Sequence, residues 1–206
     1  MTTEPVVFIV DDDPAFRESL AILILSIGLK SKAFGSADEF LKQFDENLPG
    51  CLILDVRMPQ ISGLALQEKL ARYPLCPPII VLTGHAEVPT ALRALKQGAI
   101  EFLQKTFSET ELREAVQRAI ALDAERRESH SKRQAVLDKL ALLTRPERQV
   151  LDLVLAGHPN KRIASNLGVS QRAVEDRRAR IMQKLEVDTL PDLVRLAVEA
   201  GLKVDQ

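Results

Sequence analysis

Residues 51–59 read CLILDVRMP, an apolar run that ends in the carboxylate Asp55. A second apolar run, residues 6–10 (VVFIV), ends in Asp11 and Asp12. In an open parallel α/β sheet with strand order 2-1-3-4-5, strands 1 and 3 are neighbours, and ligands bind beyond their carboxyl ends. The sequence therefore predicts that the three carboxylates converge into a pocket for a phosphate and a metal ion.

Two further polar residues stand at the ends of apolar runs. Thr83 closes the run at residues 79–82 (IIVL), and Lys105 comes shortly after residues 100–103 (IEFL). Because the carboxyl ends of parallel strands meet at one edge of a sheet, we expect both side chains to reach the same pocket.

Helix signals alternate with these apolar runs. Asp13 before Pro14 is typical of a helix start, and Ser36 and Ser108 each open a capping box. The alternation predicts five βα units, an α/β fold whose parallel sheet has the order 2-1-3-4-5 and lies between two layers of helices.

The chain-wide composition is that of a globular protein. Its 206 residues are 46% hydrophobic and 28% charged, which suits one large domain or two small ones. The amino terminus lacks the features of a signal peptide, and no apolar run approaches the roughly 18 residues that a membrane span needs. Cys51 and Cys76 lack metal-ligand spacing. We therefore expect a cytoplasmic protein with free thiols and no membrane contact.

Charge divides the chain into three parts. Residues 1–122 hold 12 Lys or Arg against 16 Asp or Glu, residues 123–139 hold 5 against 4, and residues 140–206 hold 11 against 9. The first part of the middle segment lacks large apolar residues, Gly and Pro, and it has acid–base pairs at i,i+4 spacing. This pattern predicts one domain over 1–122, a charged helical linker over 123–139 and a second domain over 140–206. A disordered tether over 123–139 is the alternative, because solvated helices are marginal without packing.

With Asp11, Asp12, Asp55, Thr83 and Lys105 in this order, the first 122 residues resemble the receiver domain of bacterial two-component response regulators. The resemblance implies that Asp55 is the nucleophile that accepts a phosphoryl group from a sensor histidine kinase. It also implies that Lys105 pairs with one phosphoryl oxygen and that Thr83 donates its hydroxyl to another.

The three carboxylates favour a bound cation. Two unit charges about 4 Å apart repel by about 4 kcal/mol at an effective dielectric near 20. Mg²⁺ prefers oxygen ligands and commonly joins one or two carboxylates to a phosphoryl group. The resemblance implies that Mg²⁺ is bound by Asp11, Asp12, Asp55 and the backbone carbonyl of Arg57.

The loop after Lys105 departs from the receiver pattern. A receiver-like switch would move Phe102 inward as Thr83 shifts toward the phosphoryl group. Receivers usually have Pro after the pocket lysine, often with a cis bond, whereas this chain has Thr106. A cis bond before Thr costs about 3–4 kcal/mol, so we expect a trans bond and a looser coupling of Lys105 to the phosphoryl group.

The last 65 residues or so have the caps and turns of an all-α domain of four helices. Thr144 to Glu147 form a capping box, Asn160 is expected to cap a second helix, and Ser170 follows a tight turn and caps a third over 171–185. Thr189 and Gly201 bracket a fourth helix. The segment resembles the helix-turn-helix of the LuxR group, and the whole chain resembles FixJ-type regulators.

The third helix is predicted to enter the major groove of double-stranded DNA. Val174, Ile181 and Leu185 recur at helical spacing and are expected to pack inward. The charged side chains of the second and third helices are the candidate DNA contacts: Lys161, Arg162, Arg172, Glu175, Arg177, Arg178, Arg180 and Lys184. We expect phosphorylation at Asp55 to promote a homodimer that binds DNA, and a contact with RNA polymerase is compatible with this function.

Two other functions remain open at this point. A phosphorylation-independent transcription regulator would agree with the departure at Thr106. A phosphohydrolase with an acidic pocket would need an acid/base residue, and no Asp-x-Asp motif follows Asp55. We expect no enzyme activity beyond self-catalysed phosphoryl transfer to Asp55 and slow autodephosphorylation.

Overall fold

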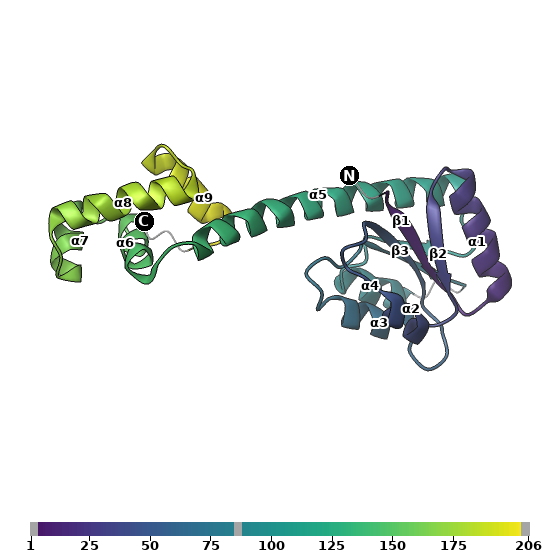
Figure 1. Cartoon of the computed structure of the whole chain (residues 1–206). Helices are drawn as coiled ribbons and strands as arrows, with labels where there is room; N and C mark the ends of the chain where they lie inside the picture. Colours follow the sequence, from purple (N-terminus) through teal and green to yellow (C-terminus); the bar gives the residue numbers. More distant parts are fainter. Residues whose placement is uncertain (1–3, 85–87, 203–206) are drawn as a thin grey trace. The chain divides into compact units, whose positions relative to one another are not determined.

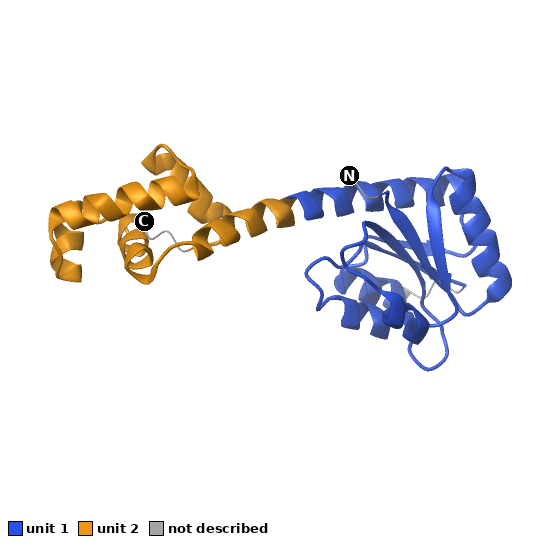
Figure 2. Ribbon diagram, viewed as in Figure 1, with its two compact units in different colours: residues 1–128 blue, residues 129–206 orange. Residues whose placement is uncertain are grey.

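The computed structural model describes residues 4–84 and 88–202, which form two compact units (Figure 2). Unit 1 comprises residues 1–128 and unit 2 comprises residues 129–206. No helix of the described residues is long and apolar enough to cross a membrane. Cys51 and Cys76 are both free, as predicted.

Unit 1 is built on a five-stranded parallel sheet (Figure 1). Its order is β2-β1-β3-β4-β5, which confirms the predicted topology. The strands are β1 Val6–Val10, β2 Lys30–Phe34, β3 Gly50–Asp55, β4 Ile79–Thr83 and β5 Glu101–Gln104. The helices that follow them are α1 Pro14–Ser26, α2 Ala37–Gln43, α3 Gly63–Leu70, α4 Val88–Lys96 and α5 Glu109–Ala141.

Two apolar clusters cover the two faces of this sheet. On one face, Leu20 and Ile24 of α1 and Leu112 of α5 pack against the strands, and on the other Phe40 and Leu66 join α2 and α3 to them. Strands buried on both faces read as continuous apolar runs, which is why residues 51–54 and 79–82 show no alternation.

The register of the sheet brings the polar strand ends together. Val10 pairs with Leu54, so Asp11 follows β1 where Asp55 ends β3. Thr83 at the end of β4 pairs with Gln104, the residue before Lys105. The predicted pocket therefore lies along one edge of the sheet.

Helix α5 runs through the segment 123–139 and continues across the boundary between the units. Asp123, at the start of the predicted charged helical linker, is only 3% exposed. Its Oδ2 accepts hydrogen bonds from the Gly50 amide at 2.8 Å and from Arg127 Nε at 2.7 Å, and Arg127 Nη2 donates to the Leu48 carbonyl at 2.7 Å. The start of the segment is thus part of unit 1. The functional domain boundaries at 122 and 139 stay predictions.

Unit 2 is helical and has its own apolar core. It contains the end of α5 together with α6 Arg145–Leu155, α7 Asn160–Leu167, α8 Gln171–Leu185 and α9 Leu190–Glu199. Val174, Ile181 and Leu185 of α8 are buried in this core, as the spacing predicts.

Local caps set the limits of these helices. Ser170 accepts from the Ala173 amide at the start of α8, and Gly168 is left-handed at φ 64° after α7. One prediction is wrong, because the residue that caps α7 is Pro159 and Asn160 is already helical. The Asn160 side chain instead accepts a hydrogen bond from Arg178 Nη1 at 2.7 Å.

Candidate functional site

Three carboxylates converge at the carboxyl edge of the sheet in unit 1. Asp11 and Asp55 are 1% and 4% exposed, whereas Asp12 is exposed to solvent. One oxygen from each of the three lies within 4.8 Å of the others. The sequence prediction that these side chains meet is consistent with this geometry.

The pocket is shaped by close backbone contacts around β1 and β3. The Asp13 amide donates to Asp11 Oδ1 at 2.9 Å, and Arg17 Nη1 donates to the Asp11 carbonyl at 2.6 Å. A Cβ added at Gly63 would lie 2.1 Å from the Asp55 carbonyl oxygen. Glycine is therefore required where α3 begins beneath the acidic strand end.

Lys105 is the cation of the pocket. Its Nζ lies 2.8 Å from Asp11 Oδ2 and 3.4 Å from Asp55 Oδ1. The Lys105 amide donates to the Thr83 carbonyl at 2.7 Å, which holds the end of β5 beside the end of β4. The lysine side chain is 22% exposed, so the ammonium faces both carboxylates and retains some contact with water.

The protonation of the pocket reflects burial and crowded charge. Burial raises the pKa of Asp55 to about 6, and the carboxylates of Asp11 and Asp12 raise it too, while Lys105 opposes the shift. Burial alone would lower the pKa of Lys105, but its contacts with Asp11 and Asp55 raise it overall. One ammonium against three carboxylates leaves excess negative charge, which favours a divalent cation.

The remaining predicted residues of unit 1 lie near this pocket or in its strands. Thr83 is 1% exposed and ends β4, and Phe102 in β5 is half-buried against the core. Arg57 is exposed. The described residues contain no cis peptide bond, so Lys105–Thr106 is trans as expected.

The pocket can therefore support one kind of chemistry. A buried carboxylate beside a lysine and two further acids, with a pKa raised to about 6, is mostly ionised at pH 7 and can act as a nucleophile toward phosphorus once its charge is offset by a cation. The strand-end pattern does not predict Arg17, Gly63 or Phe16, whose ring contacts Lys105.

The candidate DNA contacts of unit 2 fall into two groups. Lys161 and Arg162 begin α7 and are exposed, as are Arg172, Glu175 and Arg180 on α8, and Arg177 is half-buried. The other two residues are engaged within the unit. Arg178 donates to Asn160, and Lys184 contacts helix α6 and the loop before it.

Lys184 contacts the buried acid Glu147, for which the sequence predicts only a place in the capping box. Lys184 Nζ donates to Glu147 Oε2 at 2.7 Å and to the Leu142 carbonyl at 3.1 Å. The same Glu147 oxygen accepts from the Thr144 amide and hydroxyl, which completes the predicted capping box. The Lys184 contact had no signal in the sequence, because its partner lies 37 residues away.

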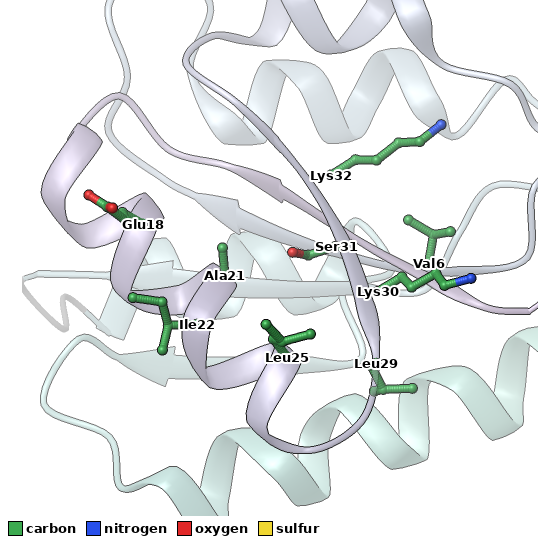
Figure 3. Close-up of a pocket in the computed structure, with 9 residues that line it drawn as sticks. All are labelled: Val6, Glu18, Ala21, Ile22, Leu25, Leu29, Lys30, Ser31 and Lys32. Atoms are coloured by element: carbon green, nitrogen blue, oxygen red, sulfur yellow. The ribbon is translucent and has the colours of Figure 1, made fainter.

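A surface hollow lies elsewhere in unit 1. It measures about 520 Å³ and is lined by apolar residues of α1, among them Ile22 and Leu25, and by Lys30 and Lys32 of β2 (Figure 3). None of the predicted site residues lines it, so we assign the phosphate chemistry to the acidic pocket.

Two family models match the chain. The model described as the response regulator receiver domain matches residues 7–117, and the model described as bacterial regulatory proteins of the luxR family matches residues 141–197. The response regulator protein TmoT of Ectopseudomonas mendocina is 42% identical over 193 residues, which cover 94% of this chain and 88% of that protein. The transcriptional regulatory protein FixJ of Azorhizobium caulinodans is 43% identical over 199 residues, 95% of this chain and 93% of that protein.

Solved structures are similar over the same extent. A low-resolution structure of the response regulator StyR has 41% sequence identity and a TM-score of 0.83, and the match covers 96% of this chain and 100% of that one. Full-length FixJ from B. japonicum has 36% identity and a TM-score of 0.57, with 97% of this chain and 98% of that one covered.

Proposed function

Because this chain belongs to the response regulators that join a receiver domain to a LuxR-type helix-turn-helix, we propose that phosphorylation of Asp55 by a sensor histidine kinase controls its dimerisation and its binding to specific DNA sequences. Proteins of this family regulate transcription and are not classical enzymes. The observation that supports Asp55 as the phosphoacceptor is its convergence with Asp11, Asp12 and Lys105 at the end of β3.

In the proposed transfer, a carboxylate oxygen of Asp55 attacks the phosphorus of a phosphohistidine. A new bond from that oxygen to phosphorus forms as the bond from phosphorus to the imidazole nitrogen breaks, and the nitrogen keeps the electron pair. Lys105 faces Asp55 at 3.4 Å and is placed to pair with a phosphoryl oxygen. Slow hydrolysis of the resulting acyl phosphate returns Asp55.

Mg²⁺ is the proposed cofactor of this step. Asp11, Asp12 and Asp55 would hold it together with the backbone carbonyl of Arg57, and it would supply positive charge to the phosphoryl oxygens. The donor set fits, because three carboxylate oxygens lie within 4.8 Å of one another and the single charge of Lys105 does not balance three carboxylates.

The proposed switch uses Thr83 and Phe102. Thr83 ends β4 beside the pocket, so its hydroxyl is placed to bind a phosphoryl oxygen, and Phe102 on β5 would move inward in response. The half-buried state of Phe102 leaves room for such a change in burial.

DNA binding is proposed for the exposed charges of α7 and α8. A helix after a Ser-capped turn enters the major groove in helix-turn-helix proteins, and two copies would bind half-sites about 10 base pairs apart. Lys161, Arg162, Arg172, Glu175, Arg177 and Arg180 are the residues we propose at this surface. Because its target is chromosomal DNA, we place the protein in the cytoplasm.

Incubation with acetyl phosphate and Mg²⁺ tests the proposal. We expect intact-mass measurement to detect one acid-labile phosphoryl group on the wild type and none on Asp55→Asn. Sedimentation should then detect a dimer, and selection from random double-stranded DNA should recover a common sequence. The same adduct on Asp55→Asn would refute the site. Equal DNA affinities of the phosphorylated and the unphosphorylated protein would favour the phosphorylation-independent regulator instead.

A further inference from the structure

The ring of Phe16 lies against the ammonium of the pocket lysine. Lys105 Nζ is 4.4 Å from the centroid of the Phe16 ring. Phe16 belongs to the first turn of α1, three residues after the cap Asp13, so this ring comes from a different element than the lysine. The ammonium is therefore contacted by an aromatic face in addition to Asp11 and Asp55.

A second ring supports the first. Phe107 meets Phe16 edge-on, with centroids 6.3 Å apart and an interplanar angle of 69°. Phe107 follows the lysine by two residues, and its amide donates to the Gln104 carbonyl at 2.8 Å. The turn that carries Lys105 and the helix that carries Phe16 are thus joined by an aromatic pair, a geometry favoured by the ring quadrupoles.

The ring of Phe16 restrains a side chain that is otherwise flexible. A lysine has a long, flexible stem, and fixing it in one place costs conformational entropy. The ammonium lies nearer to Asp11 than to Asp55, 2.8 Å against 3.4 Å, although the phosphoryl group is proposed to form on Asp55. A ring face attracts the cation without competing for its hydrogen bonds, and it limits the excursion of the ammonium to solvent.

We propose that Phe16 is a positioning residue for Lys105, which holds the ammonium within reach of Asp55 for phosphoryl transfer. The positioning role of Phe16 rests on the function proposed above, whereas the contact between Phe16 and Lys105 does not depend on that function. The loop after Lys105 has Thr106 where receivers usually have Pro, and the Phe16–Phe107 pair supplies contacts that restrain this loop in the present chain.

Plain packing predicts a different outcome from positioning. Phe16 is half-buried and lies beside the apolar cluster of α1 and α5, so a merely structural ring would be replaced adequately by an apolar side chain of similar size. Leucine retains apolar volume but has no aromatic face, whereas tyrosine retains the face. The two substitutions therefore separate the roles.

The kinetic test measures the initial rate of Asp55 phosphorylation by acetyl phosphate with saturating Mg²⁺. We expect Phe16→Leu to lower the rate about two- to fivefold, the range of an exposed cation–π contact, and Phe16→Tyr to recover most of it. In a Lys105→Met background, Phe16→Leu should have no further effect. Phe44→Leu, which removes a ring that packs against Phe40 in the apolar cluster on the other face of the sheet, is the matched control.

Equal rates for Phe16→Leu and the wild type, or an equal loss with and without Lys105, would overturn the proposal. If the wild type takes up no phosphoryl group at Asp55, the proposed function fails. The contact between ring and lysine must then be judged from unfolding.

Unfolding without metal supplies that second measurement. The chain has one tyrosine, Tyr73, and no tryptophan, so tyrosine fluorescence in urea follows unit 1 in the full chain. A cycle of Phe16→Leu and Lys105→Met should show a coupling of about two- to fivefold in the unfolding equilibrium constant. Strictly additive effects would refute a direct contact between the two side chains.

Discussion

The buried carboxylate of Glu147 should control the stability of unit 2. It is 4% exposed and accepts hydrogen bonds from the Thr144 amide, the Thr144 hydroxyl and Lys184 Nζ. Glu147→Gln retains an oxygen that can accept from Thr144, but it places a neutral amide against the ammonium. The substitution therefore tests the charge interaction between Glu147 and Lys184 more than the capping contact with Thr144.

The magnitude follows from the exposure of the two partners. A hydrogen bond to a charged group contributes about 1.5–3 kcal/mol, and an exposed ion pair about 0.2–1 kcal/mol. The Lys184 side chain is 33% exposed, so we expect an intermediate loss of about 1–2 kcal/mol. In a domain of this size, 1 kcal/mol shifts Tm by about 4–8 °C, which predicts a decrease of roughly 4–16 °C.

The loss should depend on pH. The hydrogen bond from Lys184 is the main reason why the pKa of Glu147 falls from 4.5 to about 2 in the folded chain, with Thr144 second. A depressed pKa in the folded state stabilises the protein at pH values above 4.5, and this stabilisation is lost as the pH falls from 4.5 toward 2. The wild type and Glu147→Gln should therefore differ at pH 7 and converge near pH 2–3.

Calorimetry of the full chain is the assay, because each compact unit can give its own transition. Glu199→Gln, an exposed acid at the end of α9, is the control and should shift neither transition. A difference between wild type and Glu147→Gln that stays constant from pH 7 to pH 3 would contradict the assignment, as would unchanged transitions at pH 7.

Three further predictions concern the pocket and α8. Gly63→Ala should lower both the stability of unit 1 in urea and the rate of Asp55 phosphorylation, because its Cβ would lie 2.1 Å from the Asp55 carbonyl. Lys184→Met should leave the DNA affinity and the slope of log K against log salt near the wild-type values, because the Lys184 ammonium is paired with Glu147 inside unit 2. Arg177→Ala should instead weaken binding and reduce the magnitude of that slope by about 0.9 if Arg177 neutralises one phosphate. Equal slopes for the two variants would refute the distinction. The pKa of Asp55 is raised to about 6 in the folded chain, so the free energy of unfolding of the metal-free protein should fall as the pH rises from about 4 to 6. Asp55→Asn should therefore be more stable than the wild type in urea unfolding at pH 7, and Mg²⁺ should reduce the difference.

The sequence was sufficient for the features that local signals determine. The strand order and the meeting of Asp11, Asp12 and Asp55 follow from polar residues at the ends of apolar runs. The limits of α8 follow from Ser170 and from the spacing of its buried residues.

Features that depend on distant partners were not predictable. Nothing near Asp123 in the chain indicates its bond to the Gly50 amide, 73 residues away. The preference of Asn for cap positions predicts a cap at Asn160, yet its side chain accepts a hydrogen bond from Arg178 of α8. Lys184 is predicted as a DNA contact from its place on α8, and its sequence neighbours do not indicate its contact with Glu147 of α6.

The bond from Gly50 to Asp123 also has a consequence for protein engineering. A chimera that grafts this sensory module onto another output module could be joined at residue 117, where the match to the receiver model ends. A junction there would remove Asp123 and Arg127 and leave the amide of Gly50 and the carbonyl of Leu48 without these partners at the start of β3. Fusions of this chain should therefore be made within residues 128–135, where the side chains of α5 are all exposed.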